Sequence, residues 1–165
     1  MSRNPTSHWT RSLLAGLVSG MRSASGPALA AWQLHDQRTS RRDSLPRRLL
    51  GSEHARGVTS AMAAGEVIAD KHPRMPSRLE APALIGRAVA GAVAAAALVP
   101  RRASAQRVIG HALVGAGAAM LGTFLSYHAR RAAVRRGGAP DPLIAVLEDA
   151  LAYAGGAFLI GKTKG

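Results

Sequence analysis

Cysteine is absent from this chain of 165 residues. Its absence excludes a disulfide, a thiol nucleophile and any metal site built on cysteine. Aromatic residues are also scarce, at 4%, so a core formed in water would rest on alanine, valine and leucine. Alanine and glycine bury little apolar area, and that area sets the hydrophobic driving force in water. In lipid, small side chains instead let helix backbones approach closely, so we expect a membrane protein.

Acidic residues are also few: the chain has 9 acidic and 22 basic residues, and its formal net charge is +13. The basic residues lie between apolar runs instead of along one helix face, and no aromatic residues interleave with them to stack bases. We therefore expect no nucleic-acid partner. The pattern is typical of loops that flank membrane spans and contact anionic lipids, at about 1 kcal/mol per Lys or Arg near the surface.

Apolar runs of membrane-spanning length divide the chain, since about 20 such residues cross a hydrocarbon core. Residues 1–10 are polar and expected to be disordered, and a single transmembrane helical domain is predicted over residues 11–162. The fold class is all-α, a polytopic membrane helix bundle in the inner or plasma membrane whose small-residue faces also allow a homo-oligomer. Full spans are predicted at about 12–34, 83–99, 108–127 and 143–160.

A short helix predicted at 58–70 leaves the number of spans open at four or five. It is either re-entrant, entering a protein-lined cavity, or interfacial, and the prolines in residues 71–82 prevent a regular helix after it. If it crosses the membrane, a faint similarity between GLVSGM and GAGAAML indicates an inverted repeat, as in some transporters. The Lys and Arg counts place both termini outside the cytoplasm with four spans and show almost no bias with five.

The predicted spans carry packing and boundary signals. Gly16 and Gly20 form a GxxxG pair, a pattern typical of close helix contacts. Pro27 is expected to kink the first span, and Trp32 lies at its end, where an interfacial aromatic belongs. The segments 35–56 and 128–142 are predicted as a polar loop and a basic turn. Further packing positions are predicted at Gly110, Gly115, Gly117 and Gly122.

Charged residues inside a span cost roughly 2.5–3.5 kcal/mol near its centre, which makes them candidates for function. Arg22, near the middle of the first span, is either functional or part of a buried ion pair. Glu148 and Asp149 lie inside the last span, where we expect at least one to pair with Arg22 or Arg87 or to hold a proton.

Glu66 and Asp70 are spaced to share one helix face. They would bind a cation, relay a proton, or pair with nearby basic residues such as Lys71. Arg87 lies close to the start of its span and is expected to snorkel to the interface. The candidate intramembrane polar site is Arg22, Glu66, Asp70, Lys71, Ser77, Arg87, Glu148 and Asp149.

Catalytic and metal-binding motifs are missing from the sequence. No nucleotide-binding loop or nucleophile elbow is present, and the six histidines show no metal-ligand spacing. Among them only His111 lies inside a predicted span and merits mutation. We therefore expect no enzyme, no metal and no cofactor.

The segments GEVIADKHPRMPSR, at residues 65–78, and PDPLIAVLEDALA, at residues 140–152, resemble a bacterial family of small integral membrane proteins, domain of unknown function 4126. The likeness covers nearly the whole chain from the first span onward. It implies a membrane location and points to the same charged residues, but it implies no activity. Residues 38–48 are the least similar part, and we expect no role for them.

Two functional hypotheses follow from these patterns. The first is a small transporter or channel-like protein with an intramembrane charged site. The alternative is a structural or assembly factor that packs against other membrane proteins through faces such as Gly16 with Gly20, or Gly115 with Gly122.

Overall fold

The computed structural model describes residues 5–37, 39–69 and 80–137, and these residues form six helices and no strand. The expectation of an all-α chain is confirmed for this part. The last predicted span, residues 143–160, lies outside the described residues. The helices are α1 (Pro5–Met21), α2 (Ser25–Leu34), α3 (Leu45–Leu50), α4 (Ala55–Ala69), α5 (Ala81–Ala97) and α6 (Ala105–Gly137).

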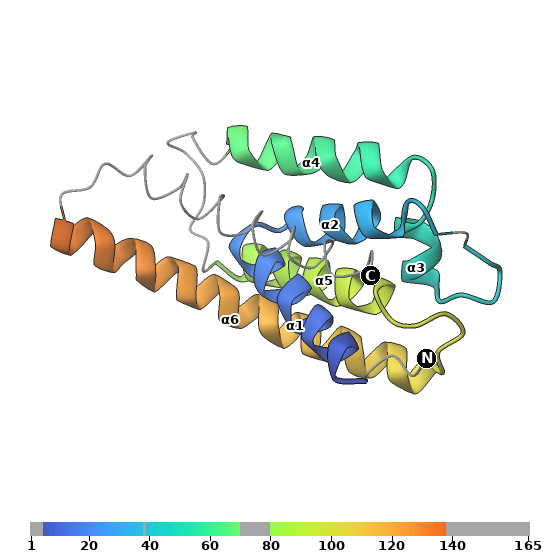
Figure 1. The fold of residues 1–165 in the computed structure, drawn as a ribbon. Helices are drawn as coiled ribbons and strands as arrows, with labels where there is room; N and C mark the ends of the chain where they lie inside the picture. Colours follow the sequence, from blue (N-terminus) through green and yellow to red (C-terminus); the bar gives the residue numbers. More distant parts are fainter. Residues whose placement is uncertain (1–4, 38, 70–79, 138–165) are drawn as a thin grey trace.

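Three helices, α1, α5 and α6, pack against one another and form the centre of the described bundle. After a short turn α2 runs back alongside α1, toward the end of the bundle where α1 begins, and α4 packs on α2 (Figure 1). The short helix α3 lies at the end of the bundle where α2 and α5 end (Figure 1). The turn that joins α1 to α2 therefore has the central helices on one side and α4 on the other.

Small residues make the contacts among the central helices. A Cβ atom added at Gly16 would lie 2.7 Å from the Cβ of Ala118, and one added at Gly91 would lie 2.7 Å from the Cβ of Ala119. Such distances are shorter than van der Waals contact, so only glycine permits these backbones to approach so closely. Gly115 lies between the two contacts and faces both Gly16 and Gly91.

The predicted packing glycines are confirmed with one exception. Gly20 lies against Ala119 of α6, and Gly122 lies against the backbone of Leu17 in α1. Gly110 lies beside Trp9, because a Cβ atom added there would lie 3.3 Å from the Trp9 ring. Gly117 has no neighbouring atom within 4 Å of an added Cβ, so its prediction as a packing position is wrong.

Large apolar side chains point outward from this bundle, and small ones fill it. Ala94, Ala95 and Ala119 are fully buried, whereas Leu113 and Leu125 are 69% and 65% exposed. Within the described residues one helix, α6, is long and apolar enough to cross a membrane, over Ala105–Ala132. At about 1.5 Å per residue, that stretch exceeds a hydrocarbon core of about 30 Å.

The first predicted span is two helices in the structure. The chain breaks at residues 22–24 and not at Pro27, which lies in the first turn of α2, where its missing N–H costs no helical hydrogen bond. Residues 5–10 are helical, in contrast to the disorder expected for residues 1–10. The polar residues of this segment extend α1 by one and a half turns instead of ending it.

Helix α6 and helix α3 also differ from the sequence expectations. Helix α6 continues through residues 128–137, where the arginines predicted a turn, because arginine is itself a good helix former. The segment 35–56, predicted as a loop, contains α3 with Pro46 in its first turn. By contrast, α4 and α5 lie close to the predicted ranges 58–70 and 83–99.

Candidate functional site

The break between α1 and α2 exposes main-chain groups inside the bundle. Helix α1 ends at Met21 and α2 begins at Ser25, so the last carbonyls of α1 and the N–H groups of Ser23 and Ala24, just before α2, need partners outside these helices. Buried main-chain groups of this kind need partners. Two charged side chains from other helices, Glu66 of α4 and Arg87 of α5, supply them.

Glu66 binds the N-terminal end of α2. Its Oε1 accepts hydrogen bonds from the backbone N–H of Ser23, at 2.9 Å, and from the Ser23 hydroxyl, at 2.8 Å. Its Oε2 accepts from the backbone N–H of Ala24 at 2.9 Å. A carboxylate is favoured there because the N-terminus of a helix carries partial positive charge.

Arg87 binds the C-terminal end of α1. Its Nη1 donates to the carbonyl oxygens of Gly20, at 2.7 Å, and Met21, at 3.1 Å. Its Nη2 lies 3.8 Å from Glu66 Oε1, an ion pair beyond hydrogen-bond distance. The Thr123 hydroxyl of α6 lies 2.9 Å from the same Gly20 carbonyl. Each helix end therefore faces a side chain of the opposite charge.

The Glu66–Arg87 pair lies well inside the protein. The side chains of Arg87 and Glu66 are 8% and 14% exposed. Thr123, which shares the Gly20 carbonyl, lies in the central part of the apolar stretch of α6. We call Ser23, Glu66, Arg87 and Thr123 the helix-break site.

The structure brings together two of the predicted site residues and adds others. Arg87 is 6% exposed and bound to main-chain carbonyls, so the prediction that it snorkels to the interface is wrong. Within the described residues its ion-pair partner is Glu66, from the short helix. Arg22 is buried beside the break, with 4% exposed. Asp70, Lys71, Ser77, Glu148 and Asp149 lie outside the described residues.

Sequence reasoning missed Ser23 and Thr123. Neither belongs to a motif, and their role depends on contacts with residues 43 and 103 positions away along the chain. The charge of Arg22 within an apolar run was the available signal of a helix break, since the short sequence RSAS that it begins offers serines, which cap helices well.

His111 lies in a second polar contact, between α6 and α1. Its Nδ1 lies 2.6 Å from the hydroxyl oxygen of Ser12, and its ring stacks on Trp9 with centroids 3.8 Å apart. Ser12 and His111 are 0% and 3% exposed. Because a substrate cannot reach either side chain without the helices separating, we read this contact as helix packing.

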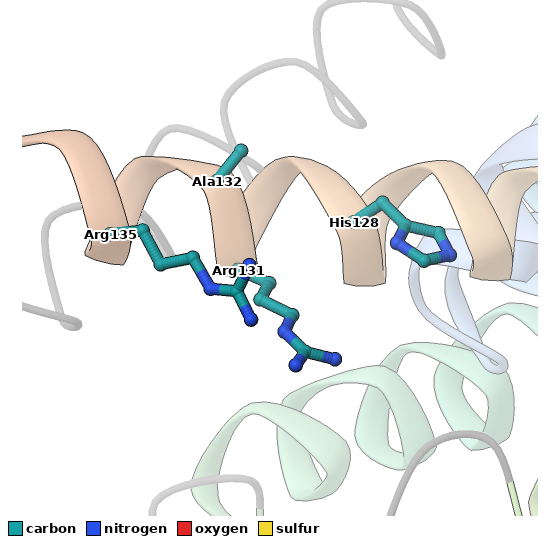
Figure 2. Close-up of a pocket in the computed structure, with 4 residues that line it drawn as sticks. All are labelled: His128, Arg131, Ala132 and Arg135. Atoms are coloured by element: carbon teal, nitrogen blue, oxygen red, sulfur yellow. The ribbon is translucent and has the colours of Figure 1, made fainter.

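Basic side chains gather on the C-terminal part of α6. Arg131 and Arg135 extend from the same side of the helix, and His128 lies further toward its N-terminus (Figure 2). Together with Ala132 they line an open hollow of about 600 Å³. Arg131 and Arg135 lie at and just beyond the C-terminal end of the apolar stretch of α6, as Arg101 and Arg102 precede its start.

Comparison with known proteins gives one result. A protein-family model with the description "Domain of unknown function (DUF4126)" matches residues 10–161. Neither the curated proteins nor the solved structures contain a match to this chain.

Proposed function

We propose a function for this chain, which belongs to the family described as Domain of unknown function (DUF4126): it is a small multi-pass transporter or channel-like protein of the inner membrane. It is not an enzyme in this proposal, and it needs no cofactor. Its working part is the helix-break site, with Glu66 as the negatively charged group on which ion passage depends.

The observation that carries the proposal is a turn between α1 and α2 whose two flanking helix ends are held by charged side chains inside an apolar bundle. Irregular backbone at membrane depth is tolerated where it is buried in protein or lines a cavity. In many secondary transporters, helix ends that lie inside the bundle form the binding site. Here the N-terminus of α2 holds Glu66, and the C-terminus of α1 holds Arg87.

The surface of the bundle supports the membrane location. Leucine, isoleucine and phenylalanine side chains are exposed along α6, including Ile109, Leu121 and Phe124. In water such a surface would be an aggregation hazard, whereas in lipid it is the ordinary exterior of a helix bundle. Arginines at both ends of the apolar stretch place it between two polar regions.

Proton flux into vesicles tests the proposal. Purified protein would be reconstituted in liposomes that contain a pH-sensitive dye, and a potassium gradient with valinomycin would drive proton entry. We expect wild-type vesicles to acidify faster than protein-free vesicles. Glu66→Gln should abolish the difference because the amide removes the negative charge from the helix-break site, while Glu53→Gln, at an exposed position, should retain it.

Two results would contradict this proposal. One is wild-type flux equal to that of protein-free vesicles. The other is full flux with a folded Glu66→Gln protein, since helix content measured by circular dichroism separates loss of function from loss of fold.

The alternative of a structural or assembly factor has less support. It relied on small-residue faces being available to other membrane proteins. In the structure Gly16, Gly20, Gly115 and Gly122 all face helices of the same chain, so these faces are already used within the bundle.

A further inference from the structure

A second polar cavity lies at the end of the bundle where α6 begins. It measures about 250 Å³ and lies between the start of α1, the ends of α2 and α5, and α3. Its lining is unusual for an apolar bundle, because it combines guanidinium groups with side-chain amides. The polar lining residues are His8, Arg11, Gln33, Gln37, Arg47 and Arg101.

Arg47 is the buried centre of this cavity, with 5% exposed. Its Nη1 donates to the carbonyl of Val99 at 3.0 Å, and its Nη2 donates to the side-chain oxygen of Gln37. Its Nε is buried and has no hydrogen-bond partner. A buried donor without an acceptor is costly, so an acceptor from a ligand would complete the coordination of this guanidinium.

Guanidinium groups from three parts of the chain line this cavity, those of Arg11, Arg47 and Arg101. Among the described residues the acid Asp43 lies beside them, with its Oδ1 3.8 Å from Arg101 Nε. Burial lowers the pKa of the Arg47 guanidinium, and Asp43 partly offsets this by raising it. Arginine nevertheless stays protonated at neutral pH. The cavity, of about 250 Å³, has room for an anion beside the unpartnered Nε of Arg47.

Phosphate is the anion that this lining suits best. Guanidinium groups present several donors in a planar fork that matches phosphate oxygens, and amides of Gln33 and Gln37 add neutral donors. Trp9 and Trp32, at the same end of the bundle, are 44% and 52% exposed. Exposed tryptophans mark the headgroup level of a membrane, where phosphates are abundant.

We propose that the cavity lined by Arg11, Arg47 and Arg101 is a binding site for a phosphate group, carried by an anionic phospholipid or free in solution. This site is separate from the helix-break site and does not depend on the proposed transport. It differs from a diffuse lipid contact at basic loops because a buried arginine with an unpartnered donor is built into it.

Thermal unfolding of the purified protein in a neutral detergent tests the proposal, because a ligand that binds the folded state raises its Tm. Three additions are compared: dimyristoyl phosphatidylglycerol, dimyristoyl phosphatidylcholine and inorganic phosphate. Arg101→Gln removes a cavity cation, and Arg102→Gln removes the adjacent charge outside the lining. Arg47 is not the test variant, because it also binds the end of α5.

We expect phosphatidylglycerol or inorganic phosphate to raise the Tm of the wild type and of Arg102→Gln, and to bind Arg101→Gln about tenfold more weakly, since one charge-assisted contact is lost. A response to phosphatidylglycerol alone identifies a lipid headgroup, and a response to both identifies the phosphate group itself. Equal responses of the two variants, equal responses to phosphatidylcholine, or no response in the wild type would overturn the proposal.

Discussion

Three charged side chains inside the described bundle bind the ends of helices. Glu66 accepts from the N-terminus of α2, Arg87 donates to the C-terminus of α1, and Arg47 donates to carbonyls at the C-terminus of α5. In each case the sign of the side chain opposes the partial charge of the helix end. Each side chain therefore gives hydrogen-bond partners to main-chain groups, and those groups in turn offset the cost of burying its charge. This explains how an apolar bundle tolerates the three charged side chains.

Replacement of Glu66 by alanine should destabilise the fold more than replacement by glutamine. Alanine leaves two N–H groups and the Ser23 hydroxyl without their acceptor, at about 1–3 kcal/mol for each buried group left unpaired. Glutamine keeps one acceptor oxygen. Unfolding by sodium dodecyl sulfate, followed by circular dichroism, measures the difference, and equal midpoints for the two variants would contradict the capping role.

Arg47→Gln should lower the free energy of unfolding by about 3–5 kcal/mol, because it breaks a buried charged contact and leaves Asp43 less compensated. Arg48→Gln is the matched control: it lies next in α3 and is exposed, so a change within about 0.5 kcal/mol is expected. The same detergent titration compares them. If both variants unfold at the wild-type midpoint, Arg47 does not hold the end of α5.

At the scale of elements, the sequence correctly predicted helices whose bounds depend on the local apolar pattern. It did not predict the helix ends that depend on contacts with distant parts of the chain. The helices α4 and α5 follow from their apolar runs. The break at residues 22–24 does not, because its partners Glu66 and Arg87 come from other helices. The continuation of α6 to Gly137 was missed since a dense run of arginines was read as a loop.

Helix contacts through glycine give a paired prediction. Gly16→Ala should destabilise the bundle by about 1–3 kcal/mol, because the added Cβ would overlap Gly115 and Ala118. Gly117→Ala, in open space on α6, should stabilise it by about 0.5–1 kcal/mol through helix propensity. Thermal unfolding in detergent compares both with the wild type, and effects of the same sign would show that the α1–α6 contact is wrong.

At the scale of the whole molecule, the described bundle has small and polar residues inside and large apolar residues outside. Composition predicted this arrangement, because the scarcity of aromatics and the abundance of alanine and glycine suit packing in lipid. The location of the site was only partly predictable. Glu66 and Arg22 were recognisable as charges in apolar segments, whereas the pairing of Glu66 with Arg87 depends on how α4 and α5 meet α1.

Cysteine accessibility along α6 is the most direct test of the membrane bundle. The chain has no native cysteine, so single replacements at Ser104, Leu113 and Arg135 report without background. An impermeant maleimide would be applied to intact cells and then to permeabilised cells. We predict that Ser104 and Arg135 label from opposite sides and that Leu113, although exposed in the bundle, stays protected by lipid. Labelling of all three positions from the same side would contradict a membrane-spanning α6 and, with it, the proposed transport function.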